Sequence, residues 1–92
     1  MSSHPDLAGK VVVVTGAGKG IGQAIAERFG AAGSSVVVHD VDDSSARAVA
    51  NGIVDTGGTA MPAPADVSDS EQVAAMFDTV MSTHGTVDVL VN

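Results

Sequence analysis

Short runs of β-branched residues alternate along this chain with segments in which apolar residues recur every three or four positions. The runs predict strands at residues 10–15, 36–39, 59–65 and 87–91, because short valine-rich stretches bounded by glycine are typical of buried strands. The intervening segments predict helices at residues 20–32, at 44–55, and from Asp69 or Ser70 to the glycine at 85. Strand and helix therefore alternate from one end of the chain to the other.

Two details refine this pattern. In the first predicted helix, Ile21, Ile25 and Phe29 fall four apart on one apolar stripe, with small residues beside them. The third predicted strand contains Pro62 and Pro64, which lack the N–H that a central strand needs, so it suits the edge of a sheet.

Helices between successive strands imply parallel pairing, and right-handed crossovers place the first two helices on one face of the sheet and the third on the other. The predicted fold class is α/β, with the element order β-α-β-α-β-α-β and the strand order 3-2-1-4. This is the first part of a doubly wound parallel Rossmann sheet, in which ligands bind at the switch point between strands 1 and 4. Residues 1–92 are interpreted as one part of a single domain.

Composition limits the possible partners. The formal net charge of −7 argues against nucleic acid and anionic membranes, because both need a basic protein face. The absence of cysteine excludes disulfides and thiolate metal sites. No apolar run approaches the roughly 20 residues that span a bilayer, and the first residues lack the pattern of a secretory signal. We therefore expect a cytoplasmic protein. His4, His39 and His84 are too scattered for a metal site or catalytic dyad, and we interpret them as surface or strand-end residues.

The residues after the first strand, Thr15-Gly16-Ala17-Gly18-Lys19-Gly20-Ile21-Gly22, carry the clearest functional pattern. A phosphate site needs backbone that phosphate oxygens can approach and a helix N-terminus directed at them. We expect Gly16 to permit a tight turn, Gly20 to open the approach, and Gly22 to let the helix pack closely on the sheet. The spacing T-G-x-x-x-G-x-G fits neither G-x-G-x-x-G nor a Walker loop, which needs Ser or Thr after Lys19.

This motif, between a valine-rich strand and a helix near the N-terminus, resembles that of the short-chain dehydrogenase/reductase family. The resemblance extends over nearly the whole chain: an acid, Asp40, follows the second strand, Asp66 and Val67 follow the third, and Leu90-Val91-Asn92 is similar to the start of the family's Asn-Asn-Ala-Gly segment. It implies that the glycine loop, residues 15–22, binds the pyrophosphate of a nicotinamide dinucleotide.

The resemblance also implies contacts for the adenine ring. The Asp66 carboxylate would accept from the exocyclic amine and the Val67 N–H would donate to the ring, while Val41 could pack on its face. Asn92 would tie the strand end to its neighbours and line the cofactor cleft. The alternative for Asp66 is a helix cap, although Asp69 would suffice for that purpose.

Two residues favour different dinucleotides. A carboxylate at Asp40, 18 residues after Gly22, can accept hydrogen bonds from the adenosine ribose and repels a 2′-phosphate, which favours NAD. In some NADP-using members of the resembled family, a basic residue at the position of Lys19 contacts that phosphate. The alternative for Asp40, and the preferred interpretation of Asp42 and Asp43, is a cap of the following helix. We predict NAD in preference to NADP, because a fixed acid should outweigh a hydrated lysine.

The reaction of the resembled family needs a tyrosine as acid/base, with a lysine and a serine beside it. This chain has no tyrosine, and Lys10 and Lys19 belong to a strand and to the loop, so we assign no catalytic residue and no metal ligand. We expect these residues to be the dinucleotide-binding, N-terminal part of a longer oxidoreductase that transfers hydride between nicotinamide and a secondary alcohol or ketone.

Other functions remain open. The same fold could serve as a non-catalytic, dinucleotide-binding regulatory module. An epimerase or dehydratase would tend to carry G-x-x-G-x-x-G, which Ile21-Gly22-Gln23 does not fit. Within the family the sequence looks similar to 3-oxoacyl-(acyl-carrier-protein) reductases, but nothing in it indicates the substrate. The resemblance also implies a small-molecule substrate and a homotetramer.

Overall fold

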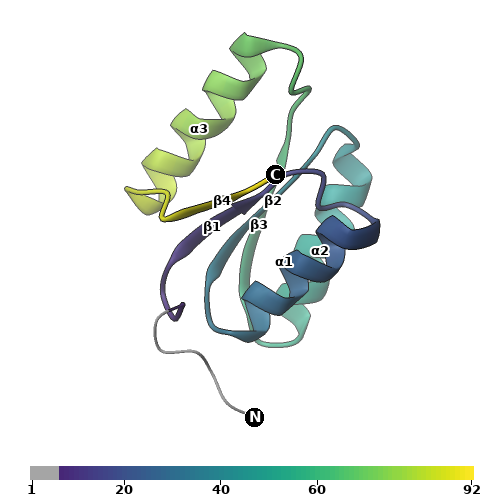
Figure 1. Ribbon diagram of the computed structural model, residues 1–92, viewed down its shortest axis with the longest axis vertical. Coiled ribbons are helices and arrows are strands. Elements are labelled where there is room, and N and C mark those ends of the chain that lie inside the picture. The colour runs from purple at the N-terminus through teal and green to yellow at the C-terminus, as the bar shows by residue number, and fades with distance from the viewer. Residues whose placement is uncertain (1–6) are drawn as a thin grey trace.

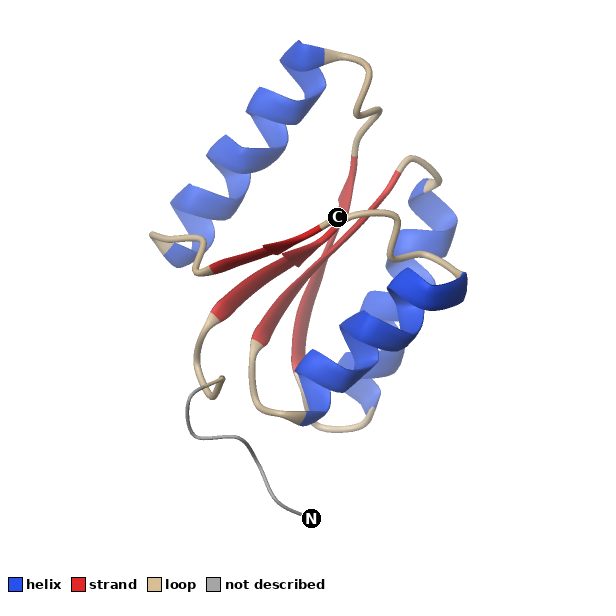
Figure 2. Ribbon diagram, in the orientation of Figure 1, coloured by secondary structure: helices blue, strands red, loops and turns tan. Residues whose placement is uncertain are grey.

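The computed structural model describes residues 7–92, so His4 lies outside the described part of the chain. Its elements form one parallel sheet with helices on both faces (Figure 1; Figure 2). In chain order they are β1 (Val11–Val14), α1 (Gly20–Ala31), β2 (Ser35–Asp40), α2 (Asp43–Asp55), β3 (Thr59–Pro64), α3 (Ser70–His84) and β4 (Val89–Val91). The predicted number, type and order of elements are confirmed. None of the helices within residues 7–92 is long and apolar enough to cross a bilayer.

The strand order is β3-β2-β1-β4, and every pairing is parallel, as predicted. The two prolines of β3 lie on the edge strand. The Ala65 N–H, just after β3, donates to the Asp40 carbonyl oxygen at 3.2 Å. Because alternate residues of a strand direct their N–H groups to the same side, the nitrogens of Pro62 and Pro64 face away from β2. The missing donors therefore cost the sheet no hydrogen bonds.

Each face of the sheet is covered by its own apolar cluster, because successive side chains of a strand point to opposite faces. Val12, Val14, Val36 and Val38 are buried against α1 and α2. Residues 11, 13 and 37, all valine, are buried with Met76 on the side of α3. Figure 1 shows α1 and α2 together on one side and α3 on the other. The predicted placement of the three helices is thereby confirmed.

The two helices on the shared face approach each other through small residues. A Cβ atom added at Gly30 in α1 would lie 2.7 Å from Cγ2 of Ile53 in α2, and one added at Gly58 would lie equally close to the same methyl. The Ile53 side chain is therefore enclosed by backbone on two sides. It is β-branched and rotationally restricted in a helix, so it has little freedom to move aside.

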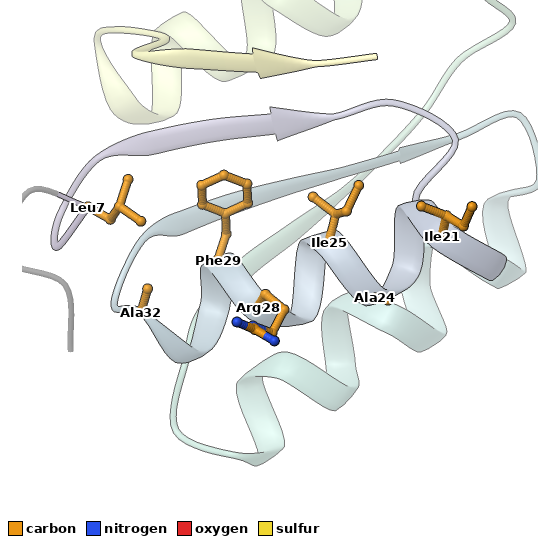
Figure 3. A pocket seen from close by; sticks show the side chains of 7 residues that line it. All are labelled: Leu7, Ile21, Ala24, Ile25, Arg28, Phe29 and Ala32. Atoms are coloured by element: carbon orange, nitrogen blue, oxygen red, sulfur yellow. The ribbon is translucent and has the colours of Figure 1, made fainter. Parts of the chain in front are cut away.

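The apolar stripe of α1 is less buried than its pattern suggests. Ile25 and Phe29 pack at the margin of the core, but Ile21 is 81% exposed, and the fully buried positions of this helix are Ala26 and Gly30. The stripe instead lines a hollow of about 400 Å³ that also includes Leu7 (Figure 3). Periodicity correctly identifies the apolar face, but it does not tell how much of that face is covered.

We expect alanine at Gly30 and alanine at Gly52 to have opposite effects on stability. Both glycines lie in helices, where alanine is favoured intrinsically by up to about 1 kcal/mol. Nothing lies within 4 Å of a Cβ at Gly52, so Gly52→Ala should raise the free energy of unfolding by about 0.5–1 kcal/mol. Gly30→Ala should lower it by about 1 kcal/mol or more, because the new methyl overpacks Ile53. Urea unfolding of the two variants beside the wild type checks this, and stabilisation by both would contradict the described helix contact.

Candidate functional site

A hollow of about 460 Å³ lies where the carboxyl ends of the strands meet, at the switch point of the sheet. It is lined by residues that follow or end all four strands: Thr15, Gly16, His39, Asp40, Val41, Ala65, Asp66, Val67 and Asn92. Six of the residues singled out from the sequence belong to this lining, namely Gly16, Asp40, Val41, Asp66, Val67 and Asn92. The others, Lys19, Gly20, Ile21 and Gly22, lie at the start of α1 and outside the lining. The hollow is therefore bordered by the end of every strand, while the start of α1 follows the glycine loop outside this lining.

The start of α1 differs from the starts of the other two helices. Asp42 caps α2 and Asp69 caps α3, each accepting hydrogen bonds from two backbone N–H groups of the first turn. This confirms the interpretation of Asp42 as a helix cap. The residue before α1 is Lys19, whose side chain makes no capping bond. Its ammonium group can only donate hydrogen bonds, so it cannot accept one from a backbone N–H. The first-turn N–H groups of α1 are thus left to bind something other than a cap.

The glycine loop, residues 15–22, has a backbone that only glycine adopts easily. Gly16 and Gly20 both have φ of +62°, and nothing lies within 4 Å of the Cβ that either lacks, so open space faces them. A Cβ at Gly22 would overlap the carbonyl oxygen of Gly16. Gly22 is therefore needed where the helix passes close to the loop itself, which corrects the expectation that its close contact is with the sheet.

Asp40 is held by backbone on two sides. Its Oδ2 accepts from the Gly18 N–H and its Oδ1 from the Asp42 N–H, each at 3.0 Å, and the residue is only 4% exposed. The hydrogen bond from Asp42 lowers the pKa of the Asp40 carboxyl; burial opposes this, and the Gly18 N–H and the charge of Lys19 add to it. An ionised carboxylate has about four lone-pair positions, so two remain. Asp40 does not cap α2, because Asp42 does.

Gly18 is a site residue that the sequence reasoning did not single out. Its missing Cβ would lie 2.7 Å from Cβ of Ser45 and 2.8 Å from Oδ2 of Asp40. Any side chain at this position would push the carboxylate away from the loop. The sequence does show a further glycine between Gly16 and Gly20, but the motif spacing alone does not tell which residue lies against it.

The strand ends on the far side of the hollow carry two exposed valines and an acid. Val41 is 68% exposed and Val67 is 65% exposed, and both line the hollow. Asp66 Oδ1 accepts from the backbone N–H of Ser68 at 2.9 Å and from its hydroxyl at 2.7 Å. These bonds, with that of the hydroxyl foremost, lower the pKa of the Asp66 carboxyl. Asp66 therefore shapes its own turn and leaves the capping of α3 to Asp69.

The end of β4 is tied to the glycine loop through Thr15. The Thr15 N–H donates to the Val91 carbonyl oxygen at 2.9 Å, and the Thr15 hydroxyl lies 3.2 Å from that oxygen and 3.3 Å from Oδ1 of Asn92. Asn92 thus links neighbouring strand ends, in the position that the sequence suggested for it.

His39 is not a surface residue, because only 4% of it is exposed. It is the penultimate residue of β2, and its imidazole lies between the loop and the end of β3. Nδ1 accepts from the Gly16 N–H at 3.2 Å, and Nε2 is 2.9 Å from the Ala65 carbonyl oxygen. His84 is half-buried at the end of α3. Among residues 7–92, no group of three acidic or histidine side chains is placed to hold a metal ion.

Comparison with known proteins gives a consistent result. A model of the family described as short chain dehydrogenase matches residues 10–92. The chain is similar to 3beta-hydroxysteroid dehydrogenase 1 of Eggerthella lenta, with 48% identity over 90 residues that make up 97% of this chain and 34% of that protein. The chain spans about a third of the length of this relative and of the glucose and 7alpha-hydroxysteroid dehydrogenases that it also matches.

Two solved structures share the arrangement of strands and helices. One is a 7 alpha-hydroxysteroid dehydrogenase complexed with NADH and 7-oxo glycochenodeoxycholic acid, with a TM-score of 0.90 and 42% identity, covering 94% of this chain and 34% of that chain. The other is a metagenomic short-chain oxidoreductase in complex with NADP, with a TM-score of 0.86 and 44% identity, covering 90% of this chain and 38% of that chain.

The lowered pKa of Asp40 predicts a pH-dependent contribution to stability. Since its carboxyl is more acidic in the folded state than in the unfolded chain, ionised Asp40 stabilises the fold above pH 3.8, and this stabilisation is lost as the pH falls below that value. At pH 7, Asp40→Asn should lower the free energy of unfolding by about 2 kcal/mol, because one backbone N–H loses a charged acceptor. The difference from wild type should shrink as the pH falls below 3.8.

Urea unfolding at a series of pH values measures both effects. Asp43→Asn is the matched control, because Asp43 forms only an exposed ion pair with Arg47 at 2.8 Å. Its removal should change the free energy of unfolding by less than about 1 kcal/mol. A wild-type advantage over Asp40→Asn that stayed constant from neutral to acid pH would contradict the role given to the carboxylate.

Proposed function

This chain belongs to the short-chain dehydrogenase family, and from that premise we propose that it binds a nicotinamide dinucleotide, with NAD preferred over NADP. The observation that carries the proposal is the uncapped start of α1, which lies beside two glycines with open space in front of them. When bound, the dinucleotide supplies a nicotinamide ring that accepts or donates hydride. The remaining contributions come from residues of this chain.

The glycine loop fits a pyrophosphate. Phosphate oxygens need close access to backbone N–H groups, and Gly16 and Gly20 place no side chain in the way. The first-turn N–H groups of α1, including those of Ile21 and Gly22, have no capping side chain to compete for them. The helix dipole adds a favourable partial positive charge at the same point. Lys19 is exposed beside the site and can approach a phosphate.

The rest of the hollow suits the adenosine half. Asp40 has two lone-pair positions left for the ribose hydroxyl groups after binding its two backbone donors. Val41 and Val67 offer exposed apolar surface to the faces of a flat ring. Asp66 lies at the same edge and can accept from an exocyclic amine, in the role that the family resemblance gives it.

The choice between the two dinucleotides depends on Asp40 and Lys19. A 2′-phosphate would come close to the Asp40 carboxylate, which is fixed by two backbone hydrogen bonds and cannot move aside without breaking them. Lys19 is exposed and must give up hydration to pair with the phosphate. The related structures hold NADH in one case and NADP in the other, so they favour neither choice.

For the complete protein we propose hydride transfer between the nicotinamide and a secondary alcohol or ketone. This chain has no tyrosine and spans a third of its relatives' length, so it supplies the dinucleotide-binding part and no acid/base residue. The substrate is a small molecule, the protein is cytoplasmic, and it assembles as a homo-oligomer.

Fluorescence titration of the purified protein with NADH and NADPH tests the proposal. We expect NADH to bind more tightly. Asp40→Ala should weaken NADH binding by roughly tenfold to a hundredfold, since it removes hydrogen bonds to a charged group, and should weaken NADPH binding less. Failure of the wild type to bind either dinucleotide would overturn the proposal.

The variant Lys19→Ala distinguishes the effect of Lys19 on the dinucleotide preference from that of Asp40. We expect this variant to weaken NADPH binding more than NADH binding, because NADPH carries an additional phosphate whose negative charge Lys19 can offset. The preference for NADH should therefore widen. Tighter binding of NADPH by the wild type, with that advantage lost in Lys19→Ala, would show that the lysine outweighs Asp40.

A further inference from the structure

The imidazole of His39 occupies an unusual position, because it joins the first glycine of the loop to the neighbouring strand end. Its Nδ1 accepts the Gly16 N–H at 3.2 Å, and its Nε2 lies 2.9 Å from the Ala65 carbonyl oxygen. The main-chain carbonyl of His39 also accepts the N–H of Ala17 at 2.6 Å. One residue of β2 therefore binds the first two amides that follow Thr15.

The two side-chain contacts select a single form of the ring. A backbone N–H can only donate, so Nδ1 must be unprotonated where it meets Gly16. A carbonyl oxygen can only accept, so Nε2 must carry the proton where it meets Ala65. Both requirements are met by the neutral imidazole protonated on Nε2, and by no other form. With both nitrogens engaged, the ring is not available as a proton acceptor for substrate.

Protonation would break the contact with the loop. The imidazolium carries a hydrogen on each nitrogen, so Nδ1–H would point at the N–H of Gly16. Two donors cannot share a hydrogen bond, and a buried N–H without an acceptor is unfavourable. Gly16 has a φ of +62° at the start of the loop, so losing this contact releases the residue at which the turn is made.

We propose that His39 is a positioning residue that holds the glycine loop in its binding conformation as a neutral imidazole, so that proton uptake by the ring weakens dinucleotide binding. The proposal rests on the function proposed above, and it adds pH control of the same site. His39 acts through Gly16, whose N–H its imidazole accepts.

Other titratable groups lie on the loop, on β2 and on the segment that follows β3, and their effects must be separated from that of the ring in any test. Lys19 belongs to the loop, and Asp40 follows His39 in the same strand. Asp66 follows Ala65 after β3, while Asp69 caps α3 and Glu71 lies in its first turn. A pH effect belongs to His39 only if it disappears when the imidazole is replaced and all these groups are kept.

Two variants with amide side chains test the two hydrogen bonds of the ring one at a time. The amide oxygen of asparagine reaches about the position of Nδ1, so His39→Asn keeps an acceptor for the Gly16 N–H. The amide of glutamine reaches about the position of Nε2, so His39→Gln keeps the donor to Ala65 and loses the bond to Gly16. Neither amide titrates, and both remove the bulk of the ring to a similar extent.

Calorimetric titration with NAD⁺ from about pH 8 to about pH 5 gives the decisive comparison. We expect wild-type affinity to fall about threefold to tenfold over this range, and His39→Asn to keep the high-pH affinity at every pH. His39→Gln should bind about threefold to tenfold more weakly throughout. Equal affinities of the two variants, or a wild-type pH profile retained by His39→Asn, would overturn the proposal.

His84→Asn is the matched control, because His84 lies at the end of α3, outside the hollow. It should retain the wild-type pH profile. Nitrogen NMR of the imidazole rings, without any dinucleotide, tests the structural step separately. We expect His39 to be protonated only on Nε2 at pH 8, and protonation on Nδ1 would overturn the proposal even if NAD⁺ binds. Wild type that binds no NAD⁺ at any pH, yet shows this tautomer, would overturn the proposed function and leave the described contact intact.

Discussion

Three successive backbone N–H groups of the glycine loop, those of Gly16, Ala17 and Gly18, all bond to the last two residues of β2. They reach the His39 imidazole, the His39 carbonyl and the Asp40 carboxylate in turn. These donors fix the path of the loop. The later N–H groups, in the first turn of α1, remain for a ligand because no side chain caps them. The loop therefore divides its donors between those that maintain its shape and those that can bind phosphate.

This arrangement requires β2 to extend beyond β1. The two strands pair from Val11 with Ser35 to Val14 with Val38, and β2 then continues for two more residues. Those residues are held in place because the preceding valines are buried on both faces of the sheet. The burial of these valines thus fixes where the polar groups at the end of β2 lie. The register of β1 on β2 decides which side chains meet the loop.

Much of this could be predicted from sequence because its signals are local. The valine runs predict strands, the prolines of β3 indicate an edge, and Asp42 and Asp69 precede helices that they do cap. The position of Asp40 in the site also follows from its place after a strand. Local signals have one feature in common: each depends on neighbours a few residues away, so chain order is sufficient to interpret them.

The features that sequence could not predict depend on contacts between distant segments. The burial of His39 arises from the loop 23 residues before it and from Ala65, 26 residues after it. Likewise Gly18 is constrained by Asp40 and Ser45, and Ile21 is exposed because no other part of the described chain covers it. A histidine or an isoleucine is the same residue in the sequence whether its side chain becomes buried or stays exposed. The contacts between distant segments determine which of the two applies.

The net charge of the chain explains why the geometry of the loop matters so much. With seven excess negative charges, these 92 residues offer no net long-range attraction to the negatively charged phosphates of a dinucleotide. Binding must then rely on donors within hydrogen-bond distance, which are the uncapped amides of α1, and small displacements of these donors are costly. A 2′-phosphate would bring further negative charge to an already acidic protein, next to a carboxylate that is fixed by backbone. The same constraint that makes the loop's position critical thus also supports the proposed preference for NAD.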